Sequence, residues 1–90
     1  MEIEFDPEKE ERNRIRHGLS FAGVEAIFEN FRIEDEDDRE DYGETRFVAL
    51  GRVGRKIVVC VWTPRADKAR IISLRKAEKD EREIYNLYRP

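Results

Sequence analysis

The sequence predicts an α+β domain in which an antiparallel β-meander packs against two N-terminal helices and one C-terminal helix. Apolar residues recur at helical spacing in the first third of the chain. From Thr45 onward they form short strand-like runs joined by brief connections, which favour antiparallel neighbours. A chain of 90 residues can form one domain with a small core, so we expect a single domain over residues 1–90.

The first elements are expected to be a short edge strand and a surface helix. Residues 2–5 alternate between polar and apolar side chains, as a half-buried strand does. Asp6 is a good helix N-cap, Pro7 suits the first helical position, and Gly18 is a good stop signal. The helix between these signals has little apolar surface, and His17 lies in its last turn.

A second helix is predicted over residues 20–30, with Ser20 as its N-cap. Its apolar side chains are spaced as on the core-facing side of an amphipathic helix. They are Phe21, Val24, Ile27, Phe28 and Phe31. We therefore expect this to be the main core helix of the N-terminal half.

An acidic segment follows at residues 34–41, where seven of the eight side chains are carboxylates. Such a run repels itself and predicts a solvated loop. It resembles a cation site in composition only, because it lacks the glycine and the terminal glutamate spacing of a calcium-binding loop.

Three β-strands are predicted in the second half, at residues 45–50, 56–63 and 69–74. Residues 51–54 contain two glycines and are expected to form the hairpin turn between the first two strands. The middle run is almost continuously apolar, which indicates a central strand buried on both faces. Residues 64–67 begin with a proline and are expected to end this strand.

The last helix is predicted over residues 76–88, directly after the third strand of the meander. The apolar side chains that share one face at 100° per residue are Ala77, Ile84 and Tyr88, with Leu87 at the edge. Glu81 falls inside this apolar arc, where a carboxylate is costly unless it is paired. An arginine partner that anchors the helix is the favoured interpretation, and a catalytic carboxylate is the alternative.

Charge is divided unevenly along the chain. Residues 1–45 hold 16 acidic and 6 basic side chains, whereas residues 46–90 hold 5 acidic and 12 basic ones. The basic half predicts a polyanionic partner, unless the two halves fold together and offset one another's charge. The single Cys60 lies in an apolar run and is expected to be buried. No run approaches the length of a membrane span and no secretory signal is present, so we expect a cytoplasmic protein.

Basic side chains in the predicted sheet and at its junction with the last helix indicate a phosphate site. Guanidinium groups offer forked donors, keep their charge, and could stabilise the phosphorane formed in RNA cleavage. An imidazole can carry a proton near neutral pH, and a phenol can donate a hydrogen bond or stack on a base. The candidates are Arg46, Arg65, Arg70, Arg75, Lys76, His17 and Tyr85.

Several candidates have a structural alternative. Arg70 and Arg75 are five residues apart, so on a regular strand they point to opposite faces, which favours Arg75, beside Lys76, over Arg70. His17 could simply stabilise a helix C-terminus, and Tyr85 could lie at the edge of the core. One histidine and one cysteine far apart do not make a zinc site. A nuclease built from these groups would be metal-independent and would use the 2′-hydroxyl of RNA as its nucleophile.

Three groups of residues follow one another along nearly the whole chain: residues 5–9, Asn13 and residues 16–21, then residues 42–47, Leu50 and Gly51, then residues 70–77, Glu81, Arg82 and Tyr85. In this order and spacing they resemble the BrnT family of toxins. The resemblance implies a type II toxin–antitoxin system, a RelE-like fold and a growth-arresting ribonuclease without a cofactor. It also implies a ribbon-helix-helix antitoxin, through which the complex reaches operator DNA.

The resemblance also implies roles for the candidate residues. The catalytic residues would be His17, Arg46, Arg75 and Lys76, and the residues that bind the RNA substrate would be Arg65, Arg70 and Tyr85. Catalytic domains of this kind are often basic, whereas this chain has a net charge of −3 because of its acidic segment. That segment would lie away from the RNA or contact a basic antitoxin. Two alternatives are a non-catalytic binding module that acts with a DNA-binding partner in autorepression, and a plain RNA-binding domain.

Overall fold

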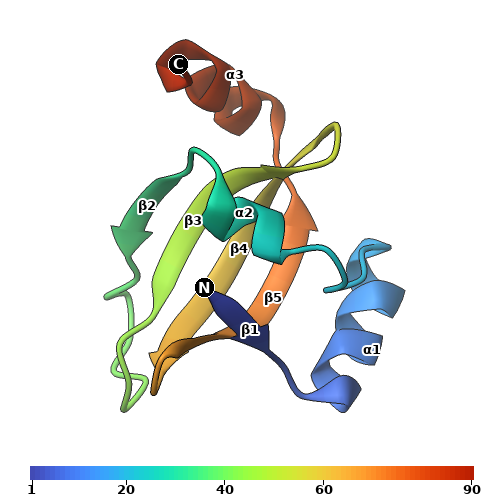
Figure 1. Ribbon diagram of the computed structural model, residues 1–90, viewed down its shortest axis with the longest axis vertical. Coiled ribbons are helices and arrows are strands. Elements are labelled where there is room, and N and C mark those ends of the chain that lie inside the picture. The colour runs from blue at the N-terminus through green and yellow to red at the C-terminus, as the bar shows by residue number, and fades with distance from the viewer.

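A five-stranded sheet lies at the centre of the computed structural model, which describes every residue, Met1–Pro90 (Figure 1). In chain order the elements are β1 (Glu2–Glu4), α1 (Pro7–His17), α2 (Glu25–Glu29), β2 (Ile33–Glu36), β3 (Phe47–Val53), β4 (Lys56–Arg65), β5 (Lys68–Lys76) and α3 (Lys79–Tyr88). The strands are ordered β1-β5-β4-β3-β2 across the sheet. The predicted α+β class is confirmed.

The sheet is mixed rather than wholly antiparallel. Strands β2 to β5 each pair antiparallel with the next one, as the short connections between β3, β4 and β5 predicted. Strand β1 instead joins the outer edge of β5 in parallel, which is possible because most of the chain separates the two. The two edge strands have only three and four residues, and short edges limit pairing with other chains.

The prediction of a loop over the acidic segment was wrong for residues 34–36. These residues belong to β2 and pair with β3, so that Glu34 lies opposite Ala49. The Glu34 carboxylate accepts hydrogen bonds from the Trp62 indole N–H at 2.8 Å and from the Arg32 guanidinium at 3.0 Å. These two hydrogen bonds offset the cost of desolvating the carboxylate beside the core.

Asp37 follows β2 directly and is buried. The Arg39 guanidinium donates to both of its carboxylate oxygens, at 2.8 and 2.9 Å, and the Tyr42 hydroxyl donates at 3.1 Å. These bonds, with that of Arg39 the largest cause, hold the pKa of Asp37 far below its usual value. The remainder of the acidic segment is exposed, as expected.

The hairpin between β3 and β4 turns later than predicted. Strand β3 continues to Val53, and the turn lies at residues 54–55 instead of 51–54. Gly51 is therefore a strand residue, and it is buried beneath α2. A Cβ atom at Gly51 would lie 2.9 Å from the Ile27 side chain, so this glycine allows α2 to approach the sheet closely.

Strand β4 is also longer than predicted, because Pro64 does not end it. Pro64 pairs with Ala69 near the end of the β4–β5 hairpin, where a proline is tolerated. The turn follows at residues 66–67, and Ala66 adopts a left-handed conformation with φ 57°.

The helix predicted over residues 20–30 was wrong in extent. Only Glu25–Glu29 form α2, because Gly23 has φ 84° and interrupts the helical backbone. Ser20 caps a turn instead of a helix, and its hydroxyl accepts a hydrogen bond from the Ala22 N–H at 3.1 Å. The apolar stripe nevertheless faces the core as predicted. Its fully buried members are Phe21, Val24 and Ile27.

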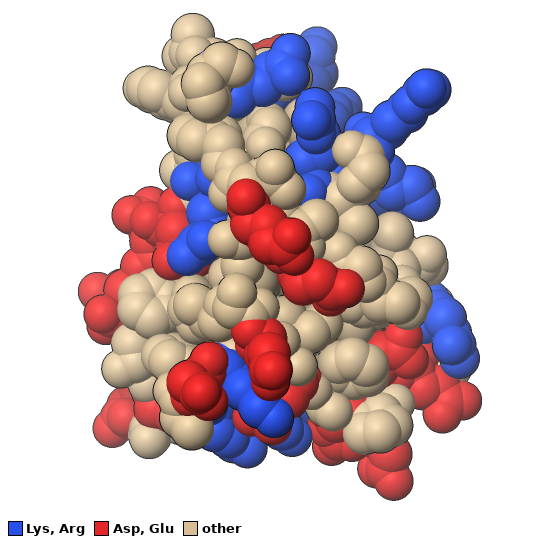
Figure 2. Space-filling model, viewed as in Figure 1, with Lys and Arg blue, Asp and Glu red and all other residues tan.

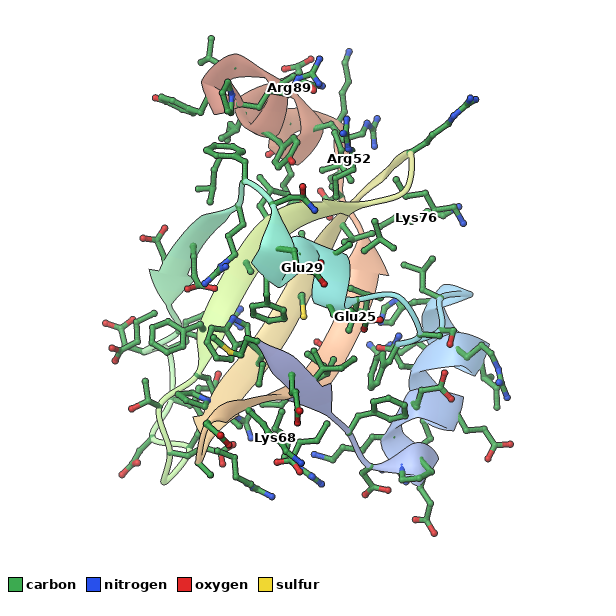
Figure 3. The ribbon with its side chains drawn as sticks, in the orientation of Figure 1. Glu25, Glu29, Arg52, Lys68, Lys76 and Arg89 are labelled. Carbon is green, nitrogen blue, oxygen red and sulfur yellow. The ribbon has the colours of Figure 1, made fainter.

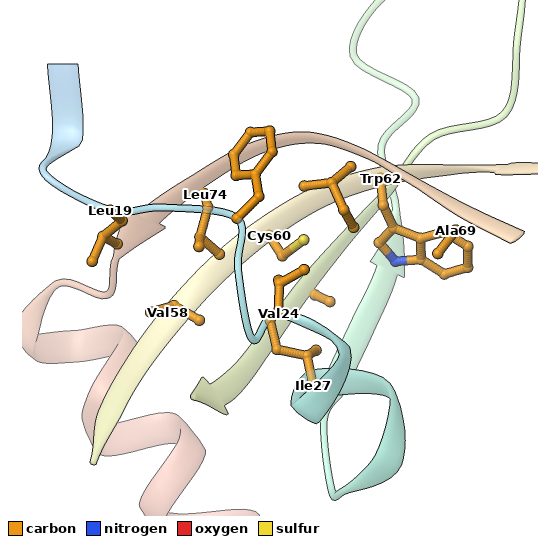
Figure 4. Packing of buried hydrophobic residues seen from close by; sticks show 11 residues of the cluster. Leu19, Val24, Ile27, Val58, Cys60, Trp62, Ala69 and Leu74 are labelled. Carbon is orange, nitrogen blue, oxygen red and sulfur yellow. The ribbon is translucent and has the colours of Figure 1, made fainter. Parts of the chain in front are cut away.

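The core fills the space between one face of the sheet and the segment that contains α2 (Figure 4). Its buried members are Leu19, Phe21, Val24, Ile27, Ala49, Val58, Cys60, Trp62, Ala69, Ile71 and Leu74. Cys60 is buried as predicted, and desolvation, followed by the Glu34 charge, raises the pKa of its thiol to about 12. Trp62 stacks on Phe47 at 5.1 Å and meets the edge of Phe28 at 5.0 Å, which closes the core on the β2 side.

Helix α1 begins and ends at the predicted signals. The Asp6 carboxylate accepts from the Glu8 N–H at 3.0 Å, and Gly18, with φ 71°, donates its N–H to the Arg14 carbonyl. It is a surface helix, as expected, and Ile15 is 78% exposed. Its one buried residue is Asn13. No helix of the protein is both long enough and apolar enough to cross a membrane.

Helix α3 lies across one end of the sheet, beyond the β3–β4 turn (Figure 1). It begins at Lys79, later than predicted, behind a reciprocal capping box between Glu78 and Glu81. It buries Tyr85, whose ring lies 5.5 Å from the Phe31 ring. The apolar face predicted from the sequence is not buried as a whole: Ala77 is buried, whereas three of its members are exposed. Their exposed fractions are 45% for Ile84, 74% for Leu87 and 66% for Tyr88.

Candidate functional site

A β-bulge interrupts the regular pairing of β4 with β5. Val61 pairs with Ser73, but the next residue, Trp62, pairs with Ile71. Ile72 is therefore an extra residue in β5, and the alternation of its side chains is reversed beyond this point.

The bulge places Arg70 and Arg75 on the same face of the sheet. They pair with Thr63 and Val59, which are four residues apart on β4 and share a face. Ser73 lies between them on this face, because it pairs with the intervening residue of β4. The prediction that the two arginines point to opposite faces was wrong. Five residues of extended strand separate the two arginines by about 15 Å. This is too far for both to bind one phosphate group, but it suits binding to successive phosphates of an extended chain.

Arg75 is held by Glu81, which confirms the predicted arginine partner of this carboxylate. The two guanidinium nitrogens lie 2.8 and 2.9 Å from the two carboxylate oxygens. Glu81 also accepts the Glu78 N–H at 2.7 Å, so one carboxylate connects β5, the helix cap and α3. The hydrogen bond from Arg75 is the largest cause that lowers the pKa of Glu81, and Glu81 in turn raises the pKa of Arg75.

Three other candidate arginines gather at the opposite end of the sheet, and each is paired with a carboxylate. Arg46 lies 3.1 Å from Glu44, and Arg65 lies 3.9 Å from the same residue. Arg70 lies 3.8 Å from Glu4. The guanidinium of Arg46 also stacks over the Tyr42 ring at 4.0 Å. The structure therefore brings these arginines together but offsets their charge.

The ion pairs explain how the two oppositely charged halves of the chain fit together. Four of the eight ion pairs join residues 1–45 to residues 46–90. All four neutralise cations at the end of the sheet away from α3. The cations of the second half without an ion pair are Arg52, Arg55, Lys56, Lys76, Lys79, Arg82 and Arg89. Figure 2 shows basic side chains gathered around α3 in the upper part of the view.

Four of these free cations form what we call the α3-end basic patch. Arg55, Lys56, Lys76 and Arg82 line a cavity of about 230 Å³ together with Ile57. They converge there because the β3–β4 turn, the end of β5 and the first turns of α3 meet at this end of the sheet. Arg82 is oriented by a hydrogen bond of 2.8 Å to the Ala77 carbonyl. Lys76, labelled in Figure 3, is the one predicted site residue in the patch.

A second basic surface runs between α1 and β5, and we call it the α1–β5 groove. Its cavity of about 380 Å³ is lined by Lys9, Arg12, Asn13, Arg16, His17, Ile72 and Ser73. Asn13 is hydrogen-bonded to β5, and residues three and four positions from it lie on the same side of the helix. This places Lys9, Arg16 and His17 at the groove. Arg12, four positions before Arg16, lines it as well, and neither arginine forms an ion pair.

The residues Lys9, Arg12 and Arg16 were not predicted as site residues. Their signal in the sequence is the spacing of three and four positions, which puts basic groups on one side of a helix with few apolar residues. His17 was predicted, and the structure places it in this groove. A groove with guanidinium, ammonium and imidazole groups can bind phosphate and transfer a proton beside it.

Tyr85 lies apart from both basic surfaces. It is buried, and its hydroxyl donates to the Phe31 carbonyl at 3.3 Å. It lines a different cavity, of about 340 Å³, with Arg52 and Arg89. The seven predicted site residues are thus distributed over several places and do not converge on one cavity. No three His, Cys, Asp or Glu side chains lie together in an arrangement that could bind a metal ion.

The sheet and its two basic surfaces define a small α+β domain that can hold a polyanion. The chain belongs to the BrnT family: residues 5–81 of the 90 match the family model described as "Ribonuclease toxin, BrnT, of type II toxin-antitoxin system". This confirms the family that the sequence resembled, and it gives the protein the class of a ribonuclease toxin with an antitoxin protein as partner. No curated protein sequence matches the chain.

Proposed function

We propose that this protein is a metal-independent endoribonuclease that binds RNA along β5 and inhibits translation and growth. The observation that supports it most strongly is the position of the basic side chains that form no ion pair in the folded chain. The α1–β5 groove includes Ser73, and the α3-end basic patch includes Lys76. These residues are three positions apart on β5, about 10 Å, and lie on opposite faces of the strand, so RNA would contact both surfaces by crossing the edge of β5 that β1 leaves uncovered. Free cations bind phosphate with release of counterions, whereas those already paired with carboxylates gain less.

The reaction would be an attack of the RNA 2′-oxygen on the neighbouring phosphorus, with departure of the 5′-oxygen and formation of a 2′,3′-cyclic phosphate. His17 would carry a proton to or from the reacting oxygens. Lys76, reaching from the neighbouring patch, would stabilise the charge that develops on the phosphorane, and Arg75 would join it only if phosphate displaces Glu81. Arg12 and Arg16 would hold the adjacent phosphate groups.

The other predicted residues would act where the RNA extends beyond these surfaces. Arg46, as a catalytic residue, and Arg65 and Arg70, as binding residues, would contact RNA only if phosphate displaces Glu44 and Glu4. Tyr85 would bind a base through the part of its ring that borders its cavity.

The proposal extends to the system in which the toxin acts. Residues 1–90 would form a single toxin domain, with a RelE-like fold, in the cytoplasm. A ribbon-helix-helix antitoxin would neutralise it and carry the complex to operator DNA.

A cleavage assay with purified protein and end-labelled RNA in EDTA tests this proposal. Cleavage should persist in EDTA, and Arg12→Glu should lower its rate at least about tenfold through lost phosphate binding. Arg14→Glu is the matched control, because Arg14 carries the same charge on the same helix but does not line the groove. Equal rates for the two variants would contradict the groove as the RNA site, and loss of cleavage in EDTA would contradict metal independence.

A second candidate function is a non-catalytic binding module that acts with its partner in transcriptional autorepression. The observation that favours it is that four of the predicted site arginines are paired with carboxylates. A guanidinium in such a pair stabilises the fold and needs no catalytic role to explain its presence. Under this alternative the purified protein binds its partner tightly and leaves RNA intact. His17→Gln separates the two, because it should abolish cleavage in the enzyme and change nothing in the binding module.

A further inference from the structure

Helix α3 carries an apolar stripe that nothing in the chain covers. Ile84, Leu87 and Tyr88 follow one another at spacings of three and one, so they lie on one face of the helix. All three are exposed, while the buried Tyr85 attaches the helix on another side. Single exposed apolar residues are ordinary, but a contiguous row of three on one helix marks an interaction surface.

A cationic cavity opens beside this helix. Arg52, Arg89, Phe31 and Tyr85 are among the residues that line its volume of about 340 Å³. Neither arginine forms an ion pair, although the chain is acidic overall. Figure 3 shows Arg52 and Arg89 at the α3 end of the molecule, far from Lys68 at the other end of the sheet.

We propose that the antitoxin binds toxin helix α3 through an amphipathic segment. Its apolar side chains would cover Ile84, Leu87 and Tyr88, and a carboxylate at one end would enter the cavity and pair with Arg52 and Arg89. The family requires an antitoxin protein as partner, and a polypeptide can supply an apolar row and a carboxylate together. RNA suits the arginines but offers nothing apolar to Ile84 and Leu87. This interface does not depend on whether the protein cleaves RNA, but an antitoxin carboxylate in the cavity would exclude the base that Tyr85 is proposed to bind there.

The test is the affinity of the full-length toxin for the purified antitoxin encoded by the adjacent reading frame, measured by isothermal titration calorimetry. The double variant Ile84→Gln/Leu87→Gln should weaken binding about ten- to a hundredfold, as should Arg52→Glu/Arg89→Glu. The matched controls are Ile15→Gln, at an exposed apolar residue of α1, and Lys68→Glu, at an exposed cation of the opposite end. Both controls should bind as the wild type does.

Two results obtained with the variants overturn the proposal. One is unchanged affinity of both double variants. The other is that the wild-type toxin forms a dimer in light scattering without antitoxin, whereas the Leu87→Gln variant is a monomer. A second copy of the toxin would then cover the apolar stripe of α3. Amide hydrogen exchange of the wild-type toxin provides a measurement that needs no variant. Residues 79–88 should exchange at least tenfold more slowly in the complex, and unchanged exchange there also overturns the proposal.

Discussion

The side-chain amide of Asn13 pairs with the backbone of Leu74 as a neighbouring strand would. Asn13 Oδ1 accepts the Leu74 N–H at 3.0 Å, and Nδ2 donates to the Leu74 carbonyl at 2.8 Å and to the Leu19 carbonyl at 3.2 Å. Strand β1 pairs with β5 only as far as Arg70, so Leu74 lies on an edge that β1 does not reach. One side chain therefore fixes α1 to the sheet and shapes the α1–β5 groove.

Replacing Asn13 by Ala should lower the free energy of unfolding by about 2–4 kcal/mol. The substitution leaves a buried N–H and two carbonyl groups without their partner, and each such loss costs about 1–3 kcal/mol before relaxation or water entry. This is a large part of the stability of a small domain. Urea denaturation followed by circular dichroism measures the change.

The matched control for this prediction is Asn86→Ala, which removes the same amide from an exposed position of α3. Its effect should stay within about 0.5 kcal/mol. Equal stability of the Asn13 and Asn86 variants would show that the bonds to Leu74 contribute little.

Features with a local cause could be predicted from the sequence. The caps at Asp6 and Gly18 fixed both ends of α1, and alternation with short turns gave β3, β4 and β5 their order and direction. The Arg75–Glu81 pair was predicted because a carboxylate inside an apolar arc requires a partner, and the pair is present although most of that arc is exposed. Each of these depends on residues that are close together in the chain.

Features that depend on distant contacts could not be predicted. The extra residue at Ile72 has no mark of its own in the sequence, yet it decides that Arg70 and Arg75 share a face. Nothing in the sequence indicated that the Asn13 side chain pairs with β5 in place of a neighbouring strand, because its partner Leu74 is 61 residues away. Gly51 suggested a turn, whereas its smallness serves the approach of α2 to the sheet. The candidate site was therefore predicted by residue type better than by geometry.

The Arg75–Glu81 pair should make stability depend on pH in the acid range. The pKa of Glu81 is lowered in the folded protein, so its contribution is complete above the unfolded pKa of about 4.3. It is lost as the pH falls from there through the folded value. Glu81→Gln should therefore be less stable than the wild type at pH 7, and the difference should shrink as the pH falls below about 4. Thermal unfolding midpoints between pH 7 and pH 2.5 measure this.

Glu83→Gln is the control for the pH series, because Glu83 is exposed on the same helix and forms no ion pair. Its unfolding midpoint should follow that of the wild type at every pH. A constant difference between Glu81→Gln and the wild type across the acid range would mean that the pair does not control acid stability.

Gly51→Ala should destabilise the protein by about 1–3 kcal/mol, as overpacking in a core does. The added methyl group would lie 2.9 Å from one γ-carbon of Ile27 and 3.3 Å from the other. In an Ile27→Ala background these atoms are absent, so the same substitution should cost little or nothing. A double-mutant cycle in urea measures the coupling, and additive effects would contradict the proposed contact.

Cys60 should be unreactive in the folded protein and reactive once it unfolds. Its thiol is fully buried in β4, and its pKa of about 12 leaves almost no thiolate at pH 8. Reaction with Ellman's reagent should therefore be about a thousandfold slower, or more, in buffer than in denaturing urea, because it requires an opening of the core. Labelling rates across a urea series should follow the unfolding transition measured by circular dichroism. Rapid labelling in buffer, with circular dichroism unchanged, would show that β4 is accessible without unfolding and that the core does not close over this strand.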